Sequence, residues 1–221
     1  MVVWAVVVAG GRGLRFGCPK QFAILAGRPV LDWSLEAARS VASGVVLALP
    51  ADGDLEAGLA DVAVHGGATR SASVRAGLAA VPGGVDVVVI HDAARPLATP
   101  ALFRAVLAPL EVEAPTAGAV PALPVVETVK RVLGGRVVAT VDRHDLVTVQ
   151  TPQAFRTGIL RSAHRAGAEG TDDAALVEAA GGTVLTVPGD PSNLKLTAPS
   201  DLALAEALLQ ARAGSGRPAG A

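Results

Sequence analysis

The chain opens with the apolar run Val2-Val3-Trp4-Ala5-Val6-Val7-Val8, which leads into Ala9-Gly10-Gly11-Arg12-Gly13-Leu14-Arg15-Phe16-Gly17-Cys18-Pro19-Lys20-Gln21. A run of this length is typical of a strand buried on both faces of a parallel sheet. The glycines after it let backbone N–H groups approach an anion closely, and Arg15 and Lys20 add two cations on a short tether. The pattern predicts a phosphate-binding loop whose cations can stabilise charge during phosphoryl or nucleotidyl transfer.

Two familiar glycine motifs do not fit this loop. A dinucleotide fingerprint starting at Gly11 needs a third glycine where Phe16 stands, and Pro19 would interrupt the helix that should follow. A Walker A loop needs Gly-Lys-Ser/Thr, whereas Lys20 lies between Pro19 and Gln21. The remaining pattern, Gly-x-Gly-x-Arg and then Pro-Lys after a strand, resembles nucleotidyltransferases that activate sugar and polyol phosphates. The alternative is a tight strand-to-helix turn with two solvated cations.

Composition narrows the class of protein. A chain of 221 residues with 51% hydrophobic residues can bury a large core. Its length suits one domain with an additional protruding segment. Nineteen Lys and Arg residues balance twenty Asp and Glu residues, so the chain lacks the net positive charge that is typical of nucleic-acid binding. The start does not resemble a signal peptide, and no apolar run is long enough to span a bilayer. The single cysteine allows no intramolecular disulfide, so we expect a soluble cytoplasmic protein.

Short β-branched runs alternate with helical patterns, which predicts an α/β fold with a mainly parallel, Rossmann-like sheet flanked by helices. The expected strands are Val2–Val8, Val45–Leu49, Val62–His65, Val87–His91, Ala117–Ala122, Val147–Gln150 and Thr183–Val187. The expected helices are Val30–Val41, Ser71–Val81, Pro100–Ala108, Phe155–Ala166 and Asp172–Ala180.

One segment breaks the alternation. Two β-rich runs between Glu127 and Val141 flank Gly134-Gly135, which predicts a protruding β-hairpin arm at about 124–145. An isolated hairpin is only marginally stable in water, so we expect a partner subunit to support it. Residues 1–209 form the single expected domain, and the aperiodic residues 210–221 are expected to be a disordered tail.

Polar clusters follow several expected strands, where ligands of open α/β sheets bind. The first is His91-Asp92-Ala93-Ala94-Arg95-Pro96, in which Asp92 is a candidate ligand for Mg²⁺ and Arg95 a candidate phosphate ligand. The alternative is an Asp92–Arg95 salt bridge that caps a turn. His91 is interpreted as mainly structural, because the histidines show no zinc-like or triad spacing.

Two further clusters complete the set. In Asn193-Leu194-Lys195-Leu196, Lys195 is expected inside a short apolar strand, where burial would require an anion; the alternative is an edge lysine facing solvent. Gly66-Gly67-Ala68-Thr69-Arg70-Ser71-Ala72-Ser73 leads into an expected helix. Its hydroxyl and N–H groups either read a base edge or cap that helix.

Taken in order, these motifs resemble the 2-C-methyl-D-erythritol 4-phosphate cytidylyltransferase family. The likeness covers residues 2–209 and includes Pro19-Lys20-Gln21-Phe22 and Thr151-Pro152-Gln153-Ala154-Phe155. It implies transfer of CMP from CTP to methylerythritol 4-phosphate, with release of diphosphate, in the non-mevalonate isoprenoid pathway. Such a transfer needs no protein nucleophile, because the substrate phosphate attacks the α-phosphorus in line.

The resemblance also implies roles for individual residues. Arg15, Lys20 and Lys195 would be catalytic, Asp92 would hold Mg²⁺ or another divalent cation, and the arm would join a homodimer. The CTP site would comprise Ala9, Gly10, Gly11, Gly13, Gly66, Gly67 and Ser73. The methylerythritol phosphate site would comprise Arg95, Thr128, Arg143, Thr151 and Thr171, with Thr128 and Arg143 acting in the neighbour's site.

Two departures from the family pattern concern CTP. Only four residues separate Arg15 from Lys20, and Ala68 replaces a polar residue near the expected cytosine position. Rival interpretations are a ribitol 5-phosphate cytidylyltransferase, a sugar-1-phosphate nucleotidyltransferase and a non-catalytic nucleotide-binding regulator. A regulator would be expected to lose Lys20, Asp92 or Lys195, and all three are present.

Overall fold

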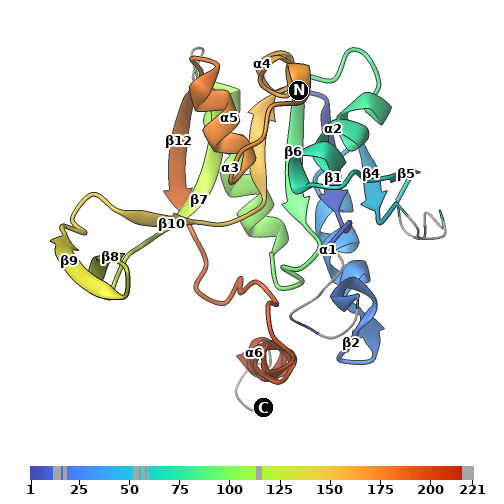
Figure 1. The fold of residues 1–221 in the computed structure, drawn as a ribbon. Coiled ribbons are helices and arrows are strands. Elements are labelled where there is room, and N and C mark those ends of the chain that lie inside the picture. The colour runs from blue at the N-terminus through green and yellow to red at the C-terminus, as the bar shows by residue number, and fades with distance from the viewer. Residues whose placement is uncertain are drawn as a thin grey trace.

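Strand β1 (Val3–Val8) lies inside an eight-stranded sheet, hydrogen-bonded on both sides (Figure 1). The computed structural model describes residues 1–11, 16, 19–51, 55, 58, 60–112 and 116–215. The sheet order is β10-β7-β11-β6-β1-β4-β5, with β12 also paired to β7. The bounds of these strands are β4 (Gly44–Leu49), β5 (Val62–His65), β6 (Val87–Asp92), β7 (Thr116–Pro124), β10 (Val147–Val149), β11 (Gln153–Arg156) and β12 (Thr183–Pro188).

Most neighbouring strands are parallel, which confirms the predicted sheet. Strand β1 runs parallel to β4 and β6, β4 to β5, and β7 to β12. The exceptions are β10, which is antiparallel to β7, and β11, which is antiparallel to both β6 and β7. The α/β class, the mainly parallel sheet and its flanking helices are therefore as expected.

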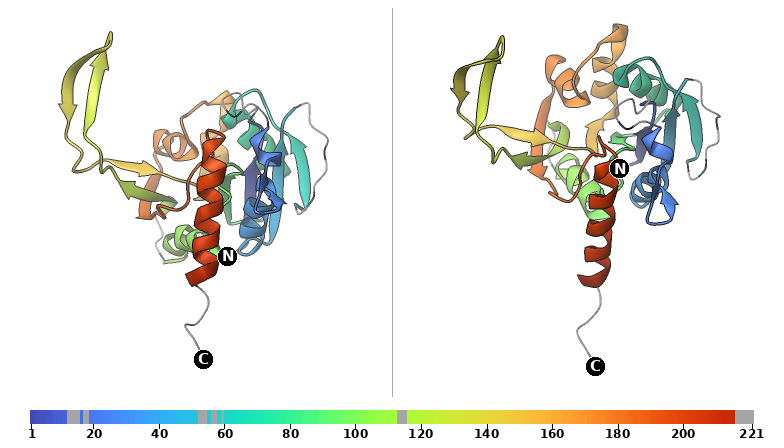
Figure 2. Two further views of the ribbon diagram at one scale, coloured as in Figure 1. Left: turned by 90° about the horizontal axis from the view of Figure 1, so that it is seen from below. Right: turned by 60° about the horizontal axis from the view of Figure 1, so that its bottom comes forward.

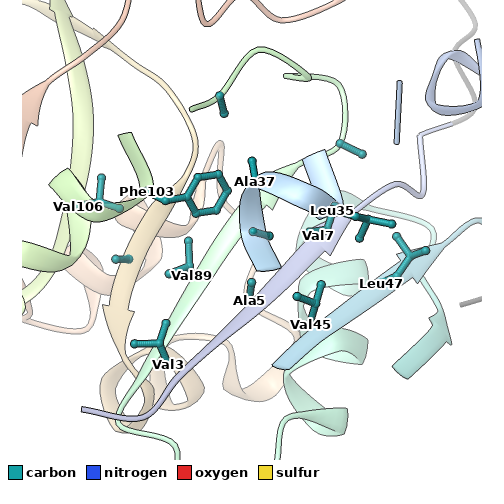
Figure 3. Close-up of a cluster of buried hydrophobic side chains, with 14 of the residues drawn as sticks. Val3, Ala5, Val7, Leu35, Ala37, Val45, Leu47, Val89, Phe103 and Val106 are labelled. Carbon is teal, nitrogen blue, oxygen red and sulfur yellow. The ribbon is translucent and has the colours of Figure 1, made fainter. Parts of the chain in front are cut away.

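Helices cover both faces of the sheet, and the period-two alternation of β1 explains why. Val3, Ala5 and Val7 join a buried cluster with residues of α1 (Val30–Arg39) and α3 (Pro100–Val112), shown in Figure 3. Val6 points to the opposite face, against residues of the remaining short helices. These are α2 (Arg70–Ala80), α4 (Thr157–Ala163) and α5 (Asp173–Ala179).

Two sequence predictions of secondary structure are wrong in part. The predicted helix over Phe155–Ala166 begins only at Thr157, because Gln153–Arg156 forms β11 between β6 and β7. The C-terminal helix α6 (Ser200–Ser215) is not among the predicted helices, and it extends into the stretch expected to be a disordered tail from residue 210. Smaller elements are the short helices Lys20–Phe22 and Arg165–Gly167 and the two-residue strands β2 (Ile24–Leu25) and β3 (Arg28–Pro29).

The predicted arm is confirmed as an antiparallel hairpin of β8 (Val129–Leu133) and β9 (Arg136–Val141). Its turn uses Gly134 and Gly135 at φ angles of +54° and +76°, the left-handed region that glycine adopts without strain. The hairpin stands away from the sheet beyond β7 and β10 (Figure 2). Nearly all its side chains are exposed. No helix among the described residues combines the length and apolarity that crossing a membrane would require.

Candidate active site

A cavity of about 780 Å³ opens beside the carboxyl ends of β1, β4 and β6. The loop after β1, the start of α2 and the end of β6 all contribute to its wall. Parallel strands bring these segments together, because their carboxyl ends share one edge of the sheet. Its lining includes the predicted CTP residues Ala9, Gly10, Gly11, Gly67 and Ser73, together with Lys20, Asp92 and Lys195.

The two glycines before α2 allow neighbouring atoms to approach the backbone closely. A Cβ atom on Gly66 would lie 2.6 Å from Ser73 Oγ and 2.9 Å from Leu49 O. One on Gly67 would lie 2.3 Å from Ala72 Cβ. Ser73 itself is buried, and its hydroxyl accepts a hydrogen bond from Gly67 N and donates one to Thr69 O. Ser73 therefore holds the loop in shape as well as lining the cavity.

At the end of β6, the Asp92 carboxylate lies between two cations. Its Oδ1 accepts a hydrogen bond from Arg70 Nε at 3.0 Å, and its Oδ2 accepts one from Lys195 Nζ at 2.6 Å. Burial would raise the pKa of Asp92, but Arg70 and Lys195 outweigh it and hold the pKa well below the usual range. Asp92 is therefore ionised at neutral pH, and the alternative of an Asp92–Arg95 cap is not what the structure has.

Lys195 is brought to this carboxylate by an irregular segment, which corrects the prediction of a strand there. Residues 193–198 have no regular secondary structure, and the fully buried side chains of Asn193 and Leu196 anchor them. Asn193 Nδ2 donates to Thr151 O at 2.9 Å. Lys195 does meet an anion within the chain, but it is not buried as expected, because 40% of its side chain is exposed.

The same segment engages two other predicted cations. Lys20 Nζ donates to Leu196 O at 2.8 Å, and Arg95 Nη1 donates to Asn193 O at 2.8 Å. Burial lowers the pKa of Arg95, with Asp92 opposing that effect. Residues 193–197 thus contact Lys20 and Arg95 and also supply Lys195.

A second cavity of about 450 Å³ adjoins the first. The predicted methylerythritol phosphate residues Arg95, Thr151 and Thr171 line it. Arg70, Asp92 and Lys195 line both cavities and so form their junction. The hydroxyl group of Thr151 helps to hold the backbone at Asp92. Its Oγ1 accepts a hydrogen bond from the Asp92 backbone N at 3.1 Å and lies 3.2 Å from His91 Nδ1.

Not every predicted site residue meets the others. Thr128 and Arg143 lie at the exposed arm and line neither cavity; Arg143 Nη1 donates to Val126 O. Gly66 is buried behind the loop rather than at the cavity surface. Arg15 and Gly13 lie outside the described residues.

Sequence reasoning places Arg70 near a helix N-terminus but gives it no role, and it does not identify Asp173. Asp173, the first residue of α5, is fully buried and forms a 2.8 Å ion pair with Arg70 Nη1. Its other oxygen lies 2.9 Å from His164 Nε2. The only signal for Arg70 is its place in the Gly66–Ser73 motif, and nothing local marks Asp173.

Donor chemistry decides whether a metal suits this site. Among the described residues there is no group of three or more His, Cys, Asp or Glu that could hold a metal ion. Mg²⁺ at a phosphate-transfer site is commonly bound by one or two carboxylates, substrate phosphates and waters. An ionised Asp92 beside the larger cavity fits that pattern, so Mg²⁺ would be held by Asp92 together with substrate oxygens.

The parallel sheet, the glycine loop after β1 and the cations around Asp92 define a nucleotidyltransferase. The sequence model of the family described as 2-C-methyl-D-erythritol 4-phosphate cytidylyltransferase matches residues 3–211. The chain belongs to this family.

Individual relatives agree with this assignment. The chain is 48% identical to a 2-C-methyl-D-erythritol 4-phosphate cytidylyltransferase of Cereibacter sphaeroides, covering 97% of this chain and 100% of that protein. It is 47% identical to a "Bifunctional enzyme IspD/IspF" of Clavibacter michiganensis, covering 96% of this chain and 55% of that protein. The crystal structure of the 2-C-methyl-D-erythritol 4-phosphate cytidylyltransferase from Thermus thermophilus superposes with a TM-score of 0.79 at 39% identity, covering 93% of this chain and 98% of that one.

Proposed function

We propose that the protein transfers CMP from CTP to 2-C-methyl-D-erythritol 4-phosphate and releases diphosphate, with the two cavities as the two substrate sites. The observation that carries this assignment is the junction, where Asp92 and the cation Lys195 face both cavities. Two phosphate-bearing substrates would meet there. Family membership supports the identity of the substrates.

The larger cavity suits CTP. Backbone N–H groups of the glycine loop and the start of the eleven-residue helix α2 are suited to a triphosphate. Lys20 lines this cavity and would neutralise phosphate charge, and the same role is proposed for Arg15. Gly67 lines this cavity and has no side chain, so a base could approach its backbone groups.

The smaller cavity suits methylerythritol phosphate. Arg95 supplies a guanidinium that can bind the phosphate as a fork, and Thr151 and Thr171 supply hydroxyl groups for the polyol. One phosphate oxygen of this substrate attacks the α-phosphorus of CTP, the bond from the α-phosphorus to the bridging oxygen breaks, and diphosphate leaves. Lys195 at the junction stabilises the negative charge that the two phosphates bring together.

We further propose that the reaction requires Mg²⁺ or another divalent cation held by Asp92. Such an ion supplies charge neutralisation for the triphosphate and for the leaving diphosphate. The residues of the chain would orient the same groups: Lys20 binds phosphate, and Arg70 holds the Asp92 carboxylate. We also propose that the protein works in the cytoplasm, which its single cysteine supports.

The functional test compares lysine variants with a surface control. Lys20→Ala and Lys195→Ala should each reduce turnover about 100-fold or more, since each removes one preorganised charge-stabilising group. Arg104→Ala, an exposed residue of α3, should retain wild-type turnover. The measurement is diphosphate release from CTP with methylerythritol 4-phosphate, ribitol 5-phosphate or glucose 1-phosphate, with and without excess chelator. Preference for ribitol 5-phosphate, or full turnover in chelator, contradicts the proposal.

We also propose a homodimer in which each arm completes the partner's site. The arm exposes Val132, Leu133, Val137 and Val138 by 51–66%, an apolar surface that a second copy could cover. Thr128 and Arg143 lie at the base of the same arm and line neither cavity of their own chain. Both predicted substrate residues would then act across the interface.

Subunit mixing tests the shared site. Lys20→Ala and Arg143→Ala are each expected to be inactive, but a mixed dimer would contain one site with both lesions and one with neither. Random equal mixing should therefore restore about a quarter of wild-type activity, because half the dimers are mixed and each has one intact site of two. Absence of recovery despite demonstrated subunit exchange means that Arg143 serves its own subunit.

A further inference from the structure

Arg70 lines the junction of the two cavities and is bound there to two protein carboxylates. Its Nε donates to Asp92 Oδ1, its Nη1 is ion-paired with Asp173, and its Nη2 is buried with no hydrogen-bond partner. Two of its three nitrogens are thus paired with protein carboxylates, those of Asp92 and Asp173.

Asp173 holds the Arg70 side chain in place through an ion pair. Its carboxylate is fully buried at the start of α5, between Arg70 and His164. The preceding Asp172 caps the helix by accepting from Ala175 N at 3.0 Å, and it accepts from Gln153 Nε2 of β11 at 2.9 Å. Helix α5 is thus tied to the sheet next to Asp173, which fixes the position of that carboxylate.

We propose that Arg70, seated on Asp173, is a positioning residue for Asp92. By holding Oδ1, it leaves Oδ2 as the one carboxylate oxygen that faces Lys195 and the joined cavities, where it can exchange that lysine for a divalent cation. A forked guanidinium can bridge two carboxylates at once, which the point charge of a lysine cannot do with the same geometry. This inference rests on the proposed function, because it gives Asp92 the metal.

The same helix provides a matched control. Arg75, five residues after Arg70, forms a 2.8 Å ion pair with Glu169 and donates to Ala168 O, so its partners do not include Asp92. Arg70→Lys removes the forked guanidinium, and Asp173→Asn removes the carboxylate that pairs with it. Both substitutions change the side-chain volume only a little. Arg75→Lys and Glu169→Gln make the same chemical changes in an ion pair that touches neither Asp92 nor Lys195.

The experiment measures CTP binding by titration calorimetry, without the second substrate, over a range of Mg²⁺ concentrations. Removing a group that orients a metal ligand commonly weakens metal affinity about 10- to 100-fold. Arg70→Lys and Asp173→Asn should therefore raise the Mg²⁺ concentration that gives half-maximal CTP affinity by about 10-fold or more. At saturating Mg²⁺ they should retain CTP affinity within about twofold, and both control variants should match the wild type.

Each outcome decides something. A loss of CTP affinity that saturating Mg²⁺ does not restore would make Arg70 a nucleotide ligand and overturn the positioning role. Equal shifts in the Arg75→Lys and Glu169→Gln proteins, or no shift in any variant, would also overturn it. Thermal unfolding identifies a misfolded variant. If either Arg70→Lys or Asp173→Asn misfolds, the Mg²⁺ dependence of the other variant tests the proposal. Failure of the proposed function is distinct, because it appears in the wild type as CTP binding that does not depend on Mg²⁺.

Discussion

His91 shows how a residue beside the site can govern stability instead of chemistry. It is fully buried, its ring lies 5.0 Å from that of Phe103, and neither cavity includes it. Burial lowers the pKa of His91 to about 4, with the charge of Asp92 opposing that shift. The imidazole is therefore neutral at pH 7 and supports Thr151 through its Nδ1 contact.

This pKa makes folding stability sensitive to acid. In the unfolded chain a histidine gains its proton near pH 6.5, whereas His91 in the folded protein does so only near pH 4. The unfolded state thus binds more protons in this window, and stability is lost as pH falls through it. Wild-type stability should drop by about 2–3 kcal/mol between pH 7 and about pH 4.5 from this residue alone.

Urea unfolding at the two pH values measures the effect. His91→Gln should lack this contribution, while His65→Gln on the exposed end of β5 should keep it. An unchanged pH dependence in His91→Gln would assign the acid sensitivity to other groups. Below about pH 4, protonation of Asp92 should lower stability further, because its folded pKa is depressed.

Sequence motifs and the family resemblance together single out Asp92, Lys195, Arg95, Thr151 and Thr171, and all five line the two adjoining cavities. The Arg70–Asp173 pair cannot be predicted in this way. Its members are far apart in the chain, and only the packing of α5 against the sheet brings Asp173 to the start of α2.

At the scale of elements, close contact between β7 and β11 leaves no space for a side chain. A Cβ atom on Gly118 of β7 would lie 2.2 Å from Phe155 Cδ1 and 3.0 Å from Ala154 O. Phe155 is itself fully buried on β11 and cannot turn away into solvent. A side chain at position 118 would therefore force Phe155 or the paired strands to shift.

Gly118→Ala should lower the free energy of unfolding by about 1–3 kcal/mol, the usual cost of overpacking a core. Gly158→Ala in α4 is the control, since a Cβ atom there meets nothing within 4 Å. That control should be neutral or stabilising by up to about 1 kcal/mol, because alanine favours a helix over glycine. Denaturant unfolding compares the two, and equal stability would contradict the packing argument.

The shortness of β11 explains why sequence patterns predict a helix that starts within it. Its four residues are too few for a period of two to be distinguished from helical periodicity. Their extended form comes from pairing with β6 and β7 on either side, which sequence alone does not display. Helix α6 escapes prediction for a related reason: it is rich in alanine and has no clear apolar stripe.

On the scale of the whole molecule, both ends of the chain build the site. The loop after β1 supplies one wall, and residues 193–197 supply Lys195 from the other end of the sequence. Arg212 of α6 secures the approach to this segment, donating to Leu97 O at 2.9 Å and pairing with Asp190 at 3.0 Å. The segment that leads to Lys195 is therefore tied to α6.

Arg212→Ala should loosen this segment while leaving the sheet intact. We expect faster backbone hydrogen exchange across residues 190–198 and a loss of about 1–3 kcal/mol in stability, since charged hydrogen bonds are removed. Exchange in β1 and β6 should not change. Mass spectrometry of exchanged peptides, with Arg104→Ala as the reference, provides the measurement; an unaffected 190–198 segment would show that other contacts hold it.

Helix α6 also determines where something can be attached to this protein. It begins three residues after Thr197 of the larger cavity, and its 16 residues rise about 24 Å, with the end directed away from the arm (Figure 2). A fluorescent fusion, an affinity tag or a solid support joined beyond α6 would be separated from both cavities by that length. Tethering there should leave both cavities accessible, whereas a tether on the hairpin would interfere with the homodimer proposed above.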